Sequence, residues 1–307
     1  MDKESILQKF ESLNIFGRGG VRAPHKPLMV MHAIGELLRG KDRLQPYSET
    51  DKKLAALLGE FGPPNSSRGT QYPFWRLQND GVWEVSDAHK IRLSSSGDAF
   101  KRDLLFYDVA GGFTEEVAGC LQANPELAIA IVENLLNGHF TESYREDILQ
   151  AVGIDLDSVK QATTQIDAGP ANRSKPKSHS RFRTNVLKAY EYQCAVCGFN
   201  VRLGQRSIAL EAAHIKWRMA GGPNEEENGL ALCTLHHKLF DRGAFTISKD
   251  LEILVSDDAY GTGGFSEWLM RFHGGKLRLP QRQTYFPSET YTHWHAREVF
   301  KGDHREL

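Results

Sequence analysis

The sequence predicts an α+β protein made of two domains and a connecting linker, and three observations lead to this prediction. The chain has 307 residues, enough for two ordinary domains that each bury a core. Apolar residues recur with both helical and strand spacing in each half. The intervening residues 161–180 are rich in Ser, Thr, Pro, Gly and Lys and offer almost nothing to bury. We therefore expect a first domain at 1–153, a linker at 154–180 and a second domain at 181–307.

The first domain is predicted to combine several helices with one β-hairpin. Each expected helix has a start or stop signal, such as Pro at its first position or Gly after its last. Residues 72–86 alternate apolar and polar side chains around Asp80-Gly81, which predicts the hairpin. Cys120, alone in an apolar stretch, is expected in the core. The expected helices span residues 2–13, residues 26–40 ended by Gly40, residues 124–138 started by Asn124 and Pro125 with Gly138 past the end, and residues 141–153 capped by Thr141 and ended by Gly153.

The composition is typical of a soluble globular protein, with 40% hydrophobic and 25% charged residues. The charged start MDKESILQKF lacks the apolar stretch of a signal peptide. No run of the sequence reaches the roughly 20 apolar residues of a membrane span. These features argue against a membrane protein and predict a cytoplasmic location.

The distribution of charge favours phosphate binding, although the net charge of -1 does not by itself. Acidic residues are absent from residues 12–35 and 168–190, while basic side chains accumulate there, a pattern found in nucleic-acid-binding proteins. A solvated basic surface is the alternative interpretation. The basic residues are Arg18, Arg22, His25 and Lys26 in the first segment, and Arg173, Lys175, Lys177, Arg181, Arg183 and Lys188 in the second.

Two pairs of potential metal ligands occur in the second domain. Cys194 and Cys197 form a CxxC pair, and Cys233 and His236 form a second pair at the same spacing. Three thiolates and one imidazole are the ligand set of a closed, tetrahedral structural zinc site. A core of buried thiols with a capping histidine is the alternative. The spacing therefore predicts a structural Zn²⁺ and assigns His236 to it.

His237, next to His236, needs a separate explanation. The stretches "AAHI", "NGLALC" and "LHHKLFD" place His214 and Asn228 upstream of His237, in one order with the two zinc pairs. Over residues 181–255 this pattern resembles the HNH endonuclease family. The resemblance implies a ββα-metal fold and a metal-dependent hydrolysis of the DNA backbone.

The resemblance also implies a role for each of these side chains. His214 would be the general base that activates water, which suits an imidazole because its pKa lies near neutral pH. Asn228 would hold the loop and the imidazole in place. His237 would ligate a catalytic Mn²⁺ or Mg²⁺ on the scissile phosphate. Asp241, four residues later on the same helical face, would be a second ligand or a partner of His237.

One position departs from the family pattern and leaves the ligand set of this metal open. Many family members carry an Asp ligand immediately before the first His, where this chain has Ala213. Glu211 lies three residues before His214, so on a regular strand it would point to the opposite face. Polar core positions without a catalytic role are the alternative interpretation of His214 and His237.

The first domain resembles the sulfur-binding domain of restriction nucleases that attack phosphorothioated DNA. The resemblance rests on "RAPHKPLMVMHAIG", "YPFWRLQNDGVWEV", "AGGF" and "LLNGHFTESYREDIL", in this order over about residues 10–153. It implies that Tyr72 and Pro73 form an apolar surface for the sulfur, with His25 and Lys26 holding the charge of the phosphate. An apolar pocket favours sulfur because burying an oxygen without hydrogen bonds costs a few kcal/mol. Further candidates for phosphate or base contacts are Arg18, Arg22 and Arg76.

Together these features predict a modification-dependent restriction endonuclease that binds double-stranded phosphorothioated DNA and cuts nearby. Because one HNH site makes one nick, we expect a homodimer, or two molecules acting together, to produce a double-strand break. Two alternatives remain open at this stage. The first domain could read methylated or hydroxymethylated bases, or the chain could be a non-catalytic, zinc-stabilised DNA-binding protein.

Overall fold

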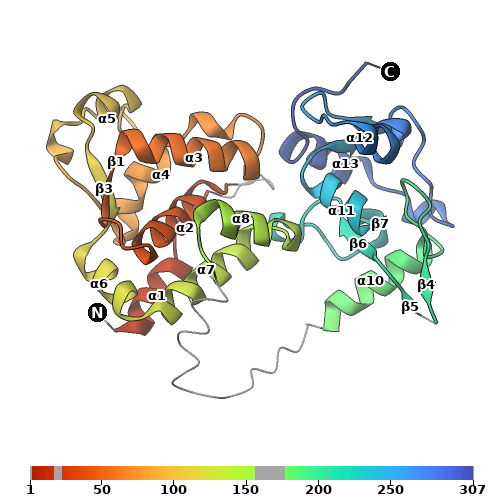
Figure 1. The fold of residues 1–307 in the computed structure, drawn as a ribbon, viewed down its shortest axis with the longest axis horizontal. Coiled ribbons are helices and arrows are strands. Elements are labelled where there is room, and N and C mark those ends of the chain that lie inside the picture. The colour runs from red at the N-terminus through yellow and green to blue at the C-terminus, as the bar shows by residue number, and fades with distance from the viewer. Residues whose placement is uncertain (1, 17–22, 156–176, 205, 307) are drawn as a thin grey trace. The chain divides into compact units, whose positions relative to one another are not determined.

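The computed structural model describes residues 2–16, 23–155, 177–204 and 206–306, and the chain forms two compact units that divide within 156–176 (Figure 1). The predicted linker falls mostly on residues 156–176, outside the described residues, and its last positions belong to a helix that begins at Lys177. None of the helices in the described ranges has the length and apolar character that crossing a membrane requires. Both units combine helices with short strands, so the predicted α+β class is confirmed.

The first unit consists of helices packed with one small antiparallel sheet. In this sheet, strand β3 (Ala110–Phe113) lies between β1 (Leu44–Pro46) and β2 (Trp83–Val85). The helices are α1 (Lys3–Glu11), α2 (His25–Leu38), α3 (Tyr47–Phe61), α4 (Gln71–Arg76), α5 (Lys101–Tyr107), α6 (Glu115–Ala123), α7 (Pro125–His139) and α8 (Arg145–Val152).

An aromatic cluster joins α4 to the sheet in the core of the first unit. The fully buried Phe74 ring packs edge-on against Tyr47 and Trp83, at centroid distances of 4.7 and 6.1 Å. Gly111 on β3 permits this packing, because a Cβ there would lie 2.5 Å from the Phe74 ring. The cluster therefore fixes α4 against β3, and with it the neighbouring residues Tyr72 and Pro73.

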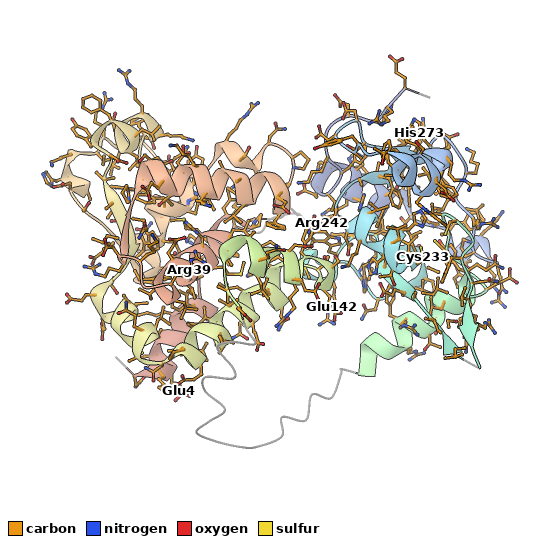
Figure 2. The ribbon with its side chains drawn as sticks, viewed as in Figure 1. Glu4, Arg39, Glu142, Cys233, Arg242 and His273 are labelled. Carbon is orange, nitrogen blue, oxygen red and sulfur yellow. The ribbon has the colours of Figure 1, made fainter. Side chains whose placement is uncertain are left out.

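Some of the predicted helix ends are confirmed. The Asp2 side chain caps α1 by accepting a hydrogen bond from the backbone N–H of Ser5, at 2.7 Å. Gly153 ends α8 with a positive φ of 69°. The guanidinium of Arg39, at the end of α2, donates to the carbonyls of Val152 and Gly153 at 2.7 Å each and so joins the two helices (Figure 2).

Other details of the first unit differ from the predictions. Helix α7 continues through Gly138 to His139, and the Asn124 side chain donates to the carbonyl of Cys120 rather than capping α7. Helix α8 begins at Arg145, after a short 3-10 turn at 142–144, rather than at Thr141. Cys120 itself is only half-buried.

The predicted hairpin over residues 72–86 is wrong in its first half. Helix α4 and a 3-10 turn over Leu77–Asp80 stand where the first strand was expected, and only β2 forms a strand. Two physical reasons favour the helix. Phe74 and Leu77, three residues apart on one helical face, are both fully buried. Pro73 lies in the first turn of α4, where a backbone N–H would have no helical partner.

The second unit is built around the predicted two strands and helix. Strands β6 (Leu210–His214) and β7 (Gly229–Cys233) pair antiparallel, and helix α11 (Thr234–Asp241) follows β7 directly. The remaining elements are α10 (Lys177–Ala189), the short hairpin β4 (Arg202–Leu203) and β5 (Arg206–Ser207), the hairpin β8 (Phe245–Ile247) and β9 (Ile253–Val255), α12 (Gly263–Trp268) and α13 (Glu289–Glu298).

Helix α10 packs against the β6–β7 pair. Gly229 pairs with His214 in this register, and a Cβ at Gly229 would collide with the side chains of Val186 and Phe182 on α10. The absence of a side chain at Gly229 therefore lets α10 approach the sheet. Because paired residues of an antiparallel ladder share a face, His214 lies on the face of the sheet that meets α10.

Candidate functional site

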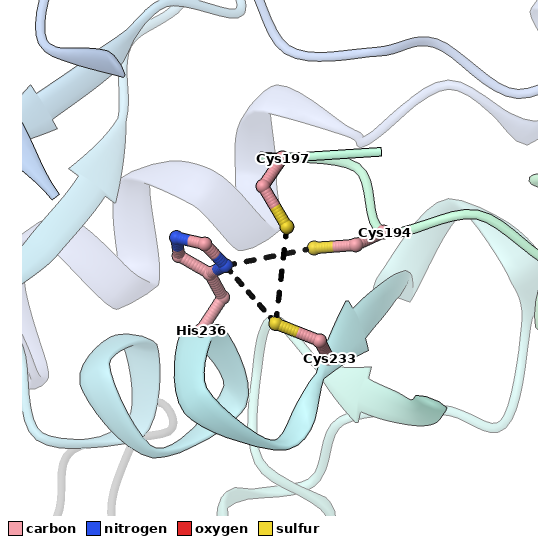
Figure 3. Close-up of side chains that lie close together, drawn as sticks. All are labelled: Cys194, Cys197, Cys233 and His236. Atoms are coloured by element: carbon pink, nitrogen blue, oxygen red, sulfur yellow. Dashed lines mark hydrogen bonds between the residues drawn. The ribbon is translucent and has the colours of Figure 1, made fainter. Parts of the chain in front are cut away.

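The four predicted zinc ligands converge in the second unit (Figure 3). Among the described residues, they form the one group of three or more His, Cys, Asp or Glu side chains whose ligand atoms all lie within 4.8 Å of one another. The Sγ atoms of Cys197 and Cys233 are 3.9 Å apart, and Nδ1 of His236 is 3.7 Å from Sγ of Cys194 and 3.1 Å from Sγ of Cys233. A tetrahedral zinc site has ligand separations of about 3.8 Å between sulfurs and about 3.5 Å between sulfur and nitrogen.

The surroundings of the cluster suit a metal ion. His236 is fully buried, and its Nε2 donates to the carbonyl of Trp268 at 2.9 Å, which leaves the Nδ1 lone pair for the cluster. Hydrogen bonds within the cluster lower the pKa of the Cys194 thiol and raise that of the Cys233 thiol, so Cys194 is the first of the two to become a thiolate. Gly198 completes the turn after Cys197 with a φ of 76°, a conformation that suits glycine. These four residues can therefore hold a metal ion.

His214 and Asn228 lie at the two ends of the loop between β6 and β7. The fully buried Asn228 side chain accepts a hydrogen bond from the N–H of Lys216 at 2.8 Å, and donates to the carbonyls of Lys216 and Pro223 at 3.0 and 2.9 Å. Nε2 of His214 is 2.9 Å from Oδ1 of Asn224 in the same loop. The amide of Asn228 thus holds the loop, and Asn224 contacts the imidazole.

The His214 ring is also held by packing. It stacks on Phe182 of α10 at a centroid distance of 3.9 Å and an interplanar angle of 15°. Because an amide oxygen only accepts hydrogen bonds, Nε2 of His214 donates to Asn224. The stacking and this hydrogen bond hold the imidazole in one orientation, as a general base requires.

His237 lies between two carboxylates. Its Nδ1 is 2.6 Å from Oε2 of Glu211, and its Nε2 is 3.4 Å from Oδ2 of Asp241. The spacing argument for Asp241 is confirmed, since residues four apart on α11 do meet. The hydrogen bond from His237 holds the pKa of Glu211 below its ordinary value. Glu211 and His214 do lie on opposite faces of β6, and this orientation brings Glu211 to His237.

Two of the expected sulfur-site residues, Tyr72 and His25, lie beside Gly69 in the first unit, and a third contacts Tyr72. A Cβ on Gly69 would lie 3.3 Å from the ring of Tyr72 and 3.5 Å from Nε2 of His25. The guanidinium of Arg76 lies over the Tyr72 ring, 4.9 Å from its centroid. Tyr72 is 42% exposed, so its ring offers an apolar surface to solvent, whereas the next residue, Pro73, is buried.

The charges of this first-unit site are mostly balanced within the protein. Lys26, nearly buried, donates to Asp80 at 2.5 Å, and Arg76 makes a bidentate ion pair with Asp98 at 2.5 and 2.6 Å. Burial lowers the pKa of His25, and its Nε2 donates to the carbonyl of Ser66 at 3.2 Å. The expected role of His25 and Lys26 in holding the phosphate charge therefore stays a prediction. Arg18 and Arg22 lie outside the described residues.

The structure places further side chains at these sites that the sequence did not single out. Asn224 contacts His214, Asp98 holds Arg76, and Glu211 contacts His237 from the strand face where no role was expected for it. Arg68 is an exposed cation beside Gly69. Of these four residues, only Arg68 could have been noticed in the sequence, as a basic residue next to a glycine. The contacts of Asn224, Asp98 and Glu211 depend on tertiary structure.

Comparisons with known proteins agree with this division into two units. Residues 3–157 match the model of the family "ScoMcrA-like, DNA sulfur-binding domain", and residues 194–248 match an HNH endonuclease model. No curated protein matches the chain.

Several solved structures are similar to parts of the chain. The sulfur binding domain of ScoMcrA complexed with phosphorothioated DNA is 25% identical, with a TM-score of 0.44, over 50% of this chain and 96% of that chain. The sulfur binding and SRA domains of ScoMcrA, in a similar complex, are 20% identical with a TM-score of 0.47 over 68% of each chain. The type IV phosphorothioation-dependent restriction endonuclease ScoMcrA is 22% identical with a TM-score of 0.42, over 57% of this chain and 32% of that chain.

Proposed function

Because this chain belongs to the family with a ScoMcrA-like DNA sulfur-binding domain, we propose that it is a phosphorothioate-dependent restriction endonuclease. The observation that carries the proposal is the presence of an HNH endonuclease domain in the same chain. We assign the sulfur-binding domain to 1–153, the linker to 154–180 and the nuclease domain to 181–307. The first domain binds the modified DNA, and the second hydrolyses the backbone nearby.

In the first domain, the exposed ring of Tyr72 meets the sulfur, with His25 alongside, and the buried Pro73 adds to the apolar surroundings of that ring rather than to the exposed surface. Sulfur is larger and a poorer hydrogen-bond acceptor than oxygen, so it loses less than oxygen when it leaves water for an apolar surface. Arg76 is held over Tyr72 by Asp98 and stiffens this surface. Three cations meet the charge of the phosphate, namely Arg18, Arg22 and Lys26. Lys26 either leaves its ion pair with Asp80 or contacts Asp80 and the phosphate together. Arg68 on the neighbouring turn adds to them.

In the second domain, Nδ1 of His214 accepts the proton of the attacking water, while Asn224 keeps the ring in place. Asn228 holds the loop that carries Asn224 at a fixed distance from the strand. His237 and Asp241 hold the catalytic Mn²⁺ or Mg²⁺, which when bound stabilises the charge that develops on the phosphate. The Cys₃His cluster holds Zn²⁺ and fixes the start of α11, which follows Cys233 directly.

The tether between the domains sets where the cut falls. A linker of this composition, rich in Ser, Pro, Gly and Lys, should let the nuclease domain reach phosphates at several distances from the bound sulfur. We therefore expect cuts at variable distances from the modification. One HNH domain makes one nick. We therefore propose that double-strand cleavage is carried out by a homodimer, or by two molecules acting together.

The direct test uses one duplex in two forms that differ only in a single phosphorothioate in each strand. Each form is incubated with the wild-type chain and Mn²⁺ or Mg²⁺, with His214→Ala as the matched control. We expect cleavage of the sulfur form alone, and none by His214→Ala. Equal cleavage of both forms would remove the sulfur-reading role. Cleavage of neither form, across all flanking sequences and both phosphorothioate stereoisomers, would favour a non-catalytic zinc protein.

A further inference from the structure

The contact between Glu211 and His237 has a geometry that distinguishes the two nitrogens of the imidazole. Oε2 of Glu211 lies 2.6 Å from Nδ1, a normal hydrogen bond, whereas Oδ2 of Asp241 lies 3.4 Å from Nε2. A carboxylate only accepts hydrogen bonds, so the short contact requires the proton on Nδ1. In the neutral imidazole, Nε2 then presents a lone pair toward the carboxylate of Asp241.

Nε2 of His237 and Oδ2 of Asp241 are therefore two potential ligands for one divalent cation. Asp241 is only 2% exposed, so its carboxylate is held within the core of the second unit. Glu211 lies on the other side of the ring and accepts a hydrogen bond from Nδ1, the nitrogen that does not face Asp241.

Glu211 is itself held in place. Its second oxygen, Oε1, accepts a hydrogen bond from the hydroxyl of Thr234 at 3.4 Å, at the first residue of α11. In the β6–β7 register, Glu211 pairs with Leu232, two residues before Thr234. The carboxylate therefore spans the first turn of α11, from Thr234 to His237, and ties the orientation of the imidazole to the strand.

We propose that Glu211 is the positioning residue of the catalytic metal site: it holds His237 as the Nδ1–H tautomer, so that Nε2 and Asp241 bind the divalent cation. This inference rests on the proposed function for the identity of the site. It also explains how the site works without a carboxylate at Ala213, the position where related nucleases carry an Asp that ligates the metal. Glu211 lies on the same face of β6 as Ala213 and acts indirectly, through His237. Carboxylate partners of this kind typically change metal affinity about 10–100-fold.

The test measures Mn²⁺ affinity of the full-length, zinc-loaded protein by electron paramagnetic resonance, without DNA. Three variants are compared with wild type: Glu211→Leu, Glu211→Gln, and the matched control Glu252→Gln, which changes a glutamate paired with Lys276 outside the site. Glu211→Leu should weaken Mn²⁺ binding about 10–100-fold, because the acceptor for Nδ1–H is lost. Glu211→Gln keeps an acceptor oxygen and should stay within about threefold of wild type, as should the control.

A second measurement keeps the proposal testable if Glu211→Leu does not fold, which zinc content and circular dichroism report. The ¹⁵N shifts of the histidine ring in the Mg²⁺-loaded wild type should show Nδ1 of His237 protonated and Nε2 ligating. Unchanged Mn²⁺ affinity in Glu211→Leu, or a proton on Nε2, would overturn the proposal. Equal, large losses in the Leu and Gln variants would overturn it as well, because they indicate that Glu211 ligates the metal directly. Failure of the cleavage test with phosphorothioated DNA would leave these affinities unaffected, so the two failures are distinguishable.

Discussion

Removing the metal from the Cys₃His cluster should unfold the second unit and leave the first unit folded. The cluster joins the CxxC turn to the start of α11, and Cys194, Cys233 and His236 are all buried in the core. Without metal, the three cysteines and His236 are packed within 4.8 Å of one another and are linked only by weak hydrogen bonds to sulfur. Apparent zinc binding energies of about 10–16 kcal/mol in small zinc domains are comparable with the 5–15 kcal/mol that ordinarily stabilises a domain.

The assay is differential scanning calorimetry of the full chain before and after chelation, with zinc release followed by a colorimetric indicator. The zinc-loaded protein should show the transitions of both units, and the chelated protein only that of the first. His236→Ala should give the same result, while Trp268, whose carbonyl accepts from His236, should become more exposed to fluorescence quenchers. A second-unit transition that is unchanged when the chain retains less than about a tenth of a zinc ion would refute this reasoning, because the loss of a binding energy this large must lower the stability of the unit.

Three further predictions concern single side chains. Phe74→Ala should destabilise the first unit by about 3–5 kcal/mol, measured by urea unfolding, because it empties the centre of a fully buried aromatic cluster. Asn228→Ala should abolish cleavage but not zinc binding, because the carbonyl and N–H of Lys216 lose their buried partner and the catalytic loop shifts. Asp98→Asn should lower stability at neutral pH by at most about 1 kcal/mol, since Arg76 is half exposed. The Arg76 hydrogen bond lowers the pKa of Asp98, so this difference from wild type should shrink once the pH falls below the ordinary Asp value of 3.8 and vanish below the lowered pKa of the folded protein.

The sequence predicted the second unit well because its signals are local. A CxxC pair, a CxxH pair and a histidine four residues before an aspartate each fix their geometry within a few residues. The structure accordingly gathers Cys194 and Cys197 with Cys233 and His236, and brings His237 to Asp241. Strand alternation also predicted correctly that Glu211 and His214 face opposite sides of β6.

The first unit was harder to predict because tertiary contacts decide it. Alternating apolar residues around Tyr72 predicted a strand, but burial of Phe74 against the sheet strand β3 selects a helix. Ion pairs such as Lys26 with Asp80 and Arg76 with Asp98 join residues 54 and 22 positions apart, and no local pattern indicates them. The basic residues of the sulfur site could be identified from the sequence. The sequence did not indicate which of them form ion pairs with acidic residues of the same unit.

The central claim is that the first domain reads the sulfur while the second performs the hydrolysis. The most direct measurement is the ratio of cleavage rates on phosphorothioated and unmodified duplexes of one sequence, for the wild-type chain and for Tyr72→Ala. The account predicts a large ratio for wild type that falls toward one in Tyr72→Ala, with the metal affinity of the second domain unchanged. An equally large ratio in the variant would contradict the assignment of sulfur recognition to the Tyr72 surface, and a ratio of one in wild type would contradict sulfur-dependent cleavage altogether.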